Sequence, residues 1–242
     1  MTVPISTLHT DSADAAADDL VPPPRVIIIF SDIWCSFAHI AVHRLHVARA
    51  ELDLTDAVRF DHRAFPLELL NGAPSPRPGT DSEVGRMAAH EPGAGWQLWQ
   101  AKDWTYPSTM LPALEATQAA KEQGLAAAEA LDLGLRRAFW AQSRNVSYLK
   151  VILDVARAAG IDADALADTL ADGRARPALM AQAAVAATDR VTCSPHLFLP
   201  DGRDYSNPGF RSRWEGAYGI GWPVVQQDDP SVIRGILEAA VA

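Results

Sequence analysis

A continuous apolar run, Val26 to Phe30, leads directly into a segment of helical periodicity, and this junction constrains the fold more than any other feature. A strand that is apolar at every position is typical of a sheet covered on both faces, as in parallel α/β sheets. The helical segment runs from Ser36 to about Leu52 without proline or glycine. Cys35 lies at the turn between the two elements.

A second strand and a long helical region follow. Residues Val58 to Ala64 alternate apolar and polar side chains, which predicts a strand and completes a βαβ unit. The stretch 66–80 is rich in proline and glycine and is expected to be an exposed loop. Because a βαβ crossover needs only about a dozen residues, the following alanine- and leucine-rich segments predict an inserted helical domain. The expected helices cover 96–104, 110–123, 125–143, 147–159, 163–171 and 177–187.

The last fifty residues regain extended character. Residues 191–199 and 204–206 flank a turn and predict a hairpin. Residues 207–228 hold several glycines and are expected to be loop, and a final helix begins at Asp229-Pro230. We therefore expect three parts. They are a disordered acidic tail (1–24), a core domain (25–80 and 188–242) and an inserted helical domain (81–187).

Composition limits the classes of partner. The formal net charge of −9 disfavours nucleic acid and anionic membranes, because both would repel an acidic surface. No apolar run of about 18 residues predicts a transmembrane helix, and residues 1–24 lack the basic and apolar regions of a secretory signal. Two cysteines in 242 residues suit a reducing compartment, so we expect a cytoplasmic protein.

The position of Cys35 predicts sulfur chemistry. A thiol at the N-terminus of a helix commonly has its pKa lowered from about 8.5 to between about 3.5 and 7.5, which favours the nucleophilic thiolate. Three residues further on, where a dithiol enzyme would carry a second cysteine, the chain has Ala38. The alternative interpretation is that Cys35 is a small buried residue without a chemical role.

Three motifs carry a resemblance to a known family. They are Asp-Ile-Trp-Cys-Ser-Phe-Ala at 32–38, Ala-Phe-Pro-Leu at 64–67 and Cys-Ser-Pro-His-Leu-Phe at 193–198. With the order of elements, they make residues 25–240 similar to the DsbA-like branch of the thioredoxin superfamily. The chain resembles FrnE-like oxidoreductases most, with 2-hydroxychromene-2-carboxylate isomerases and kappa-class glutathione transferases as relatives. The resemblance implies an α/β, thioredoxin-like fold with a large inserted helical domain.

The resemblance also implies roles for individual residues. Cys35 would be the nucleophile, Pro195 a cis-proline facing its sulfur, and Ser194 would present its backbone beside the thiol. The oxidoreductases of this family use Cys-x-x-Cys, so Ala38 implies a monothiol enzyme here. Its resolving thiol would be Cys193 or an external small thiol such as glutathione or mycothiol, with no firmly bound cofactor.

Two alternatives remain open. The isomerase and transferase relatives carry serine where this chain has Cys35, and hold a thiol cofactor there. A glutathione- or mycothiol-dependent transferase or isomerase is therefore the second hypothesis. A non-catalytic binding protein on the same fold is the third. In each case we expect a small thiol or disulfide-containing substrate or ligand, and a monomer or homodimer.

The remaining candidate residues are expected to lie near Cys35 in the fold. His39 lies one helical turn further on, where an imidazolium would stabilise the thiolate. The side chains of Trp34, Ser36, Phe37 and Trp104 are candidates for lining a substrate cleft. Cys193 is alternatively a buried packing residue. Histidines at 39, 43 and 46 share helical spacing. Two histidines one turn apart need a further protein ligand to bind zinc, and no Cys/His pair with zinc-finger spacing is present, so no metal site is expected.

Overall fold

The computed structural model describes residues 20–217 and 221–242, and a four-stranded sheet of order β2-β1-β3-β4 lies at its centre. Strand β1 (Val26–Ser31) pairs parallel with β2 (Arg59–Ala64) and antiparallel with β3 (His196–Phe198). Helix α2 (Ser36–Glu51) connects β1 to β2, which confirms the predicted βαβ unit. Strand β4 (Asp204–Ser206) pairs antiparallel with β3 and completes the predicted hairpin.

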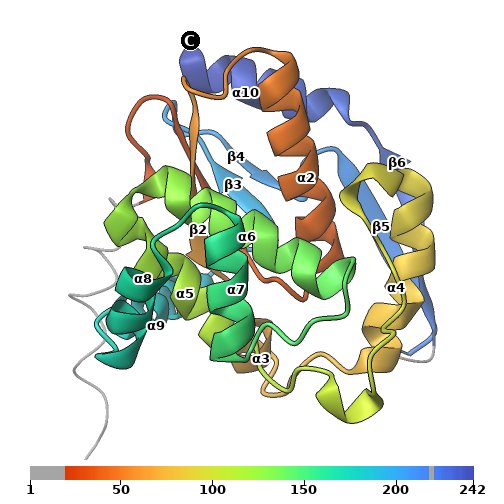
Figure 1. Cartoon of the computed structure of the whole chain (residues 1–242). Coiled ribbons are helices and arrows are strands. Elements are labelled where there is room, and N and C mark those ends of the chain that lie inside the picture. The colour runs from red at the N-terminus through yellow and green to blue at the C-terminus, as the bar shows by residue number, and fades with distance from the viewer. Residues whose placement is uncertain (1–19, 218–220) are drawn as a thin grey trace, which may run out of the picture.

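Both faces of β1 are buried, as its apolar run predicts. Ile27 and Ile29 pack against α2 and the C-terminal helix α10 (Ser231–Val241), which lie together on one face of the sheet (Figure 1). Ile28 and Phe30 pack on the opposite face in a cluster that includes Phe198 of β3. Burial of alternate side chains in two separate clusters fixes the register of this central strand.

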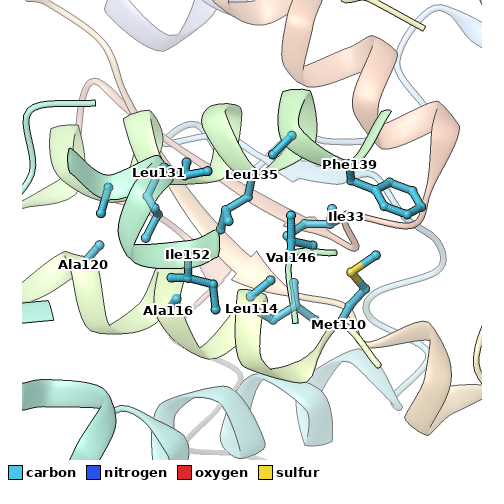
Figure 2. Close-up of a cluster of buried hydrophobic side chains, with 14 of the residues drawn as sticks. Ile33, Met110, Leu114, Ala116, Ala120, Leu131, Leu135, Phe139, Val146 and Ile152 are labelled. Carbon is cyan, nitrogen blue, oxygen red and sulfur yellow. The ribbon is translucent and has the colours of Figure 1, made fainter. Parts of the chain in front are cut away.

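A helical segment fills the chain between β2 and β3. Its core packs α5 against α6 and α7, with Leu114, Leu131 and Ile152 facing one another (Figure 2). Ile33, from the junction of β1 and α2, joins the same cluster. The division into two domains stays a prediction. The helices are α3 (Leu67–Leu70), α4 (Arg77–His90), α5 (Leu111–Ala120), α6 (Leu125–Trp140), α7 (Leu149–Ala158), α8 (Ala163–Ala171) and α9 (Arg176–Ala186), with 3-10 turns at Pro92–Ala94, Asp103–Thr105 and Lys121–Gln123.

Side chains from these helices satisfy the outer edge of β2. The N–H of Phe60 donates to Glu129 of α6 at 2.8 Å, and the N–H of Ala64 donates to Gln182 of α9 at 2.8 Å. Gln118 of α5 donates to a carbonyl between these two residues at 3.2 Å. Because buried backbone groups must be paired, three helices together replace a neighbouring strand at this edge.

Residues 207–228 contain a hairpin, so the prediction of a loop there is wrong. Strands β5 (Phe210–Glu215) and β6 (Trp222–Asp228) form a separate two-stranded sheet beside α4 (Figure 1). Of the glycines that suggested a loop, Gly209, Gly216 and Gly221 lie outside the strands. Gly209 and Gly216 adopt φ of +71° and +82°, a conformation that favours glycine.

The predicted loop at 66–80 contains α3 and the start of α4, and the helix over 77–90 was not expected. Pro78 lies in the first turn of α4. The N–H groups of a first turn have no partner within the helix, so a proline there removes no hydrogen bond. The same residue type that suggested a loop is compatible with the start of this helix.

The helix expected over 96–104 is absent, and only a 3-10 turn at its end is present. The backbone N–H of Gln97 donates to the carbonyl of Trp140 at 2.9 Å, and that of Gln100 to the Ser143 hydroxyl at 2.9 Å. These acceptors come from α6 and the residues after it. They replace the carbonyl four residues earlier that a helix would have used.

The prediction of a disordered tail over residues 1–24 is wrong at the C-terminal end of that range. Leu20 is 3% exposed and belongs to the cluster around Ile28 and Phe198. Residues 1–19 lie outside the described part of the chain. Among the helices that the structure describes, none combines the length and apolar character needed to cross a membrane.

Candidate functional site

Cys35 is the N-cap residue of α2. Its backbone is extended, with φ −79° and ψ 113°, and its Sγ accepts the N–H of Ala38 at 3.4 Å. Asp32 holds the preceding turn, because its carboxylate accepts the N–H of Trp34 and the N–H of Leu67, each at 2.8 Å. The turn between β1 and α2 therefore presents the sulfur in one defined position.

The segment before β3 meets this sulfur. The Cys35 thiol donates to the carbonyl oxygen of Ser194 at 2.9 Å, and the Ser194 hydroxyl accepts the N–H of Asp32 at 3.0 Å. The Ser194–Pro195 peptide bond is cis. Because β3 begins at His196 and pairs with β1, the sheet itself places Ser194 and Pro195 next to Cys35.

The thiol is protected from solvent. Cys35 is 8% exposed, and burial raises the pKa of its thiol to about 12. Hydrogen bonds with Ser194 and Ala38 oppose this rise, whereas the nearby carboxyl groups of Glu83 and Asp32 add to it. The expectation of a lowered pKa is therefore wrong, since loss of hydration outweighs the helix N-terminus.

Two buried carboxyl groups accompany the thiol. Burial raises the pKa of Asp32 to about 6 against the opposing backbone N–H groups that it accepts. Burial also raises the pKa of Glu83 to about 7, and the side chain of Ser36 partly offsets that rise. The sequence analysis did not single out Glu83, because it did not expect the helix α4 that carries this residue. A carboxylate on a helix of otherwise ordinary composition gives no local signal of burial.

Arg136 of α6 contacts the turn that carries Cys35, and the sequence analysis did not single it out either. It is fully buried and donates to the carbonyl of Asp32 at 2.9 Å and to the Ser31 hydroxyl at 2.7 Å. Its charge is balanced by Asp132 at 2.6 Å. Arg136 thus connects the helical segment to the turn that carries Cys35.

A cavity of about 400 Å³ opens over Cys35. The predicted cleft residues Trp34, Ser36 and Phe37 line it, whereas Trp104 does not. Trp104 is 76% exposed on a 3-10 turn, so its prediction as a cleft residue is wrong. The remaining lining residues are Leu67, Asn71, Ala73, Pro74, Ser75, Pro76 and Glu83, from α3, α4 and the segment between them.

His39 does not act as a charged neighbour of the thiol. Its Nε2 lies 3.1 Å from the carbonyl oxygen of Ala94, and its ring packs against Trp96 and Trp140. Burial lowers the pKa of His39 to about 3, so the imidazole is neutral. The predicted imidazolium role is wrong because the ring lies within the aromatic core.

The two cysteines are both free thiols. Cys193 is partly exposed, and its Sγ donates to the carbonyl oxygen of Pro195 at 3.2 Å. Its role as a resolving thiol stays a prediction. Within residues 20–217 and 221–242, no group of three or more histidine, cysteine or acidic side chains is arranged to hold a metal ion.

Comparisons with known proteins agree with this architecture. The family model of the DSBA-like thioredoxin domain matches residues 26–217. A structure described as a probable DsbA oxidoreductase from Streptomyces coelicolor is 20% identical, with 89% of each chain covered and a TM-score of 0.62.

Other solved structures share the fold. The cytosolic disulfide reductase DsbM from Pseudomonas aeruginosa is 16% identical, with a TM-score of 0.56 over 88% of this chain and 97% of that one. A 2-hydroxychromene-2-carboxylate isomerase is also 16% identical, with a TM-score of 0.54 over 74% of this chain and 87% of that one. A search of curated proteins finds no match. At these identities the likeness shows the fold alone.

Proposed function

Because the chain belongs to the DSBA-like thioredoxin domain family, we propose that it is a thiol–disulfide oxidoreductase with Cys35 as its single nucleophile. One observation carries the proposal. The Cys35 sulfur lies at the floor of a cavity between the Ala38 N–H and the Ser194 carbonyl, next to Pro195. A disulfide entering the cavity would meet that sulfur and the backbone of the segment before β3.

The reaction proceeds in two exchanges. Cys35 loses its proton to solvent, and the thiolate attacks one sulfur of a disulfide RSSR to give a Cys35–S–SR mixed disulfide and RS⁻. Ala38 supplies no internal thiol, so a second thiol R′SH attacks the mixed disulfide, restores Cys35 and leaves as RSSR′. We assign R′SH to glutathione or mycothiol. Alternatively, Cys193 attacks the Cys35 sulfur of the mixed disulfide, which forms a Cys35–Cys193 disulfide and releases RSH, and two small thiols R′SH then reduce that disulfide and leave as R′SSR′. A small thiol acts here as a cosubstrate rather than a firmly bound cofactor.

The raised pKa of Cys35 favours the reductive direction. Strongly oxidising members of the thioredoxin superfamily have a reduced form stabilised as a thiolate. Here burial disfavours the Cys35 thiolate, so Cys35 is a poor leaving group when a substrate dithiol attacks the mixed disulfide. We place the enzyme in a reducing cytoplasm as a monomer or homodimer that acts on small thiols and disulfides, without nucleic acid or membrane partners.

Intact mass spectrometry tests the proposal. The Cys193→Ser variant is incubated at about pH 8 with 2-hydroxyethyl disulfide, which should add one mercaptoethanol unit to Cys35. Addition of glutathione should remove the adduct, and Cys35→Ser should form none. In the wild type, an internal disulfide in place of the adduct would assign Cys193 as the resolving thiol.

The alternatives give different results. Absence of an adduct on the folded protein, with modification after denaturation, would refute the redox proposal and leave a non-catalytic protein. Tight binding of glutathione or mycothiol that persists in Cys35→Ser would instead support the transferase or isomerase hypothesis.

A further inference from the structure

The cavity over Cys35 is neutral except for one side chain. Of the described residues that line it, Glu83 alone bears an ionisable carboxyl group, and none is a lysine, arginine or histidine. Glu83 is 7% exposed, so its charge acts within a poorly hydrated space. A ligand that occupies the cavity next to Cys35 therefore shares it with this carboxylate.

The charged residues around the cavity, beyond those that line it, also carry a net negative charge. Asp32 lies beneath the thiol, and Glu68 of α3 acts electrostatically on it. The cations nearby are already neutralised. Arg136 is paired with Asp132, and Arg77 at the start of α4 is paired with two aspartates.

One feature opposes the acidic groups. The N-terminus of α2 carries about half a positive charge, which attracts anions. The Cys35 sulfur already accepts the N–H of Ala38 in that first turn. Two ionised carboxylates exceed half a positive charge, and a Cys35 thiolate adds a third negative charge.

We propose that this site selects small disulfides by charge, preferring cationic over neutral and neutral over anionic molecules, with Glu83 as the specificity-determining residue. The inference rests on the proposed exchange at Cys35 and deepens it by naming the substrate class. It also predicts that glutathione, which carries two carboxylates and one ammonium group, resolves the mixed disulfide more slowly than an uncharged small thiol does. Uncharged small thiols of the mycothiol kind are compatible with it.

The exchange with a cationic substrate balances as written above. The Cys35 thiolate forms one S–S bond with cystamine, the S–S bond of cystamine breaks, and one cysteamine leaves as its thiolate and is protonated by solvent. The second ammonium group then remains in the cavity near Glu83. A dicarboxylate disulfide of the same length would place a negative charge there instead.

The size of the probe matters because a second cavity lies on the other side of Phe37. That cavity has a volume of about 360 Å³ and carries Arg211. A long anionic molecule would reach Arg211 and obscure the effect of Glu83. The test therefore uses three short disulfides that differ mainly in charge, namely cystamine, 2-hydroxyethyl disulfide and 3,3′-dithiodipropionate.

The experiment measures the rate constant for the first exchange at Cys35 in the Cys193→Ser background at about pH 8, where Glu83 is mostly ionised. Each rate is divided by that of 2-mercaptoethanol with the same disulfide, which removes the intrinsic reactivity of the probe. We expect the normalised cystamine-to-dithiodipropionate ratio to be about tenfold. Added salt should reduce the ratio only slightly, because ions screen buried charges less than exposed ones.

A matched pair of variants isolates Glu83. Glu83→Gln should lower the ratio towards one, whereas Asp56→Asn, which removes an equal charge from a fully exposed position, should leave it unchanged. An equal ratio in the wild type and Glu83→Gln, or a preference for the dianion, overturns the inference while the exchange itself stands. If Glu83→Gln does not fold, the wild-type ratio alone decides the question, and a ratio of one or below refutes the inference. Reaction with none of the three probes refutes both proposals.

Discussion

The alkylation rate of Cys35 is the most direct measure of how the site changes the pKa and the reactivity of its thiol. Burial raises the pKa of Cys35 from 9.0 to about 12, which lowers the thiolate fraction near neutral pH about thousandfold relative to an ordinary thiol. A more basic thiolate is intrinsically more nucleophilic, by a factor of about 15 to 30 over three pH units. Iodoacetamide should therefore modify Cys35 about thirty- to sixtyfold more slowly than free cysteine near pH 7.

The assay follows modification by intact mass in the Cys193→Ser variant, with free cysteine in the same tube as the reference. The rate should rise about tenfold per pH unit between about pH 7 and pH 10, without levelling off, because the thiolate fraction rises in that proportion below the pKa. The Cys35→Ser variant, which keeps Cys193, reports any background reaction of the second thiol.

The opposite result has a clear meaning. Modification of Cys35 as fast as free cysteine near pH 7, with a plateau below about pH 8, would show that the helix N-terminus dominates and that burial does not. The physical account of the thiol given above would then be wrong. The sequence-based expectation of an activated thiolate would be right instead.

Three further predictions concern stability. Because the pKa of Glu83 is raised from 4.5 to about 7, the folded state holds this proton more tightly than the unfolded state. The free energy of unfolding should fall by up to about 3 kcal/mol from pH 4.5 to above pH 7, and urea titrations of Glu83→Gln should show a weaker dependence. Arg136→Met should cost about 3 to 5 kcal/mol in urea titration, because it removes the arginine paired with the buried Asp132 carboxylate and leaves that carboxylate beside the buried imidazole of His62, and a loss below 1 kcal/mol would contradict this. Gly134→Ala should lower the melting temperature, since the new Cβ would lie 2.6 Å from Val155, whereas Gly85→Ala, which meets no atom within 4 Å, should raise it.

The parts of the fold that sequence predicts are those whose signals are local. The apolar run Val26 to Phe30 carries burial on both faces of a strand within five residues, and the structure confirms it. The hairpin formed by β5 and β6 lacked such a signal. Its strands mix charged and apolar residues, and glycines at its ends hid them.

The residues of the site also differ in whether a local sequence signal identifies them. Cys35 and Ser194 were found from motifs, and the structure brings them within hydrogen-bond distance. The acidity of the thiol could not be predicted, because its burial depends on walls supplied by α4 and residues 71–76. Glu83 and Arg136 act through long-range packing, and no spacing within either helix distinguishes them from surface charges.

The side chains of α5, α6 and α9 that pair with β2 determine whether the helical segment can be deleted without loss of the fold. Excising the helical segment, or replacing it with a short connection, would remove Glu129, Gln118 and Gln182 together and leave a row of unpaired N–H and C=O groups on β2. Such an open edge pairs readily with the same edge of another molecule. The expected product of that deletion is a dimer or aggregate paired through the β2 edges rather than a minimal monomeric thioredoxin-like protein, so the helical segment is not a detachable module.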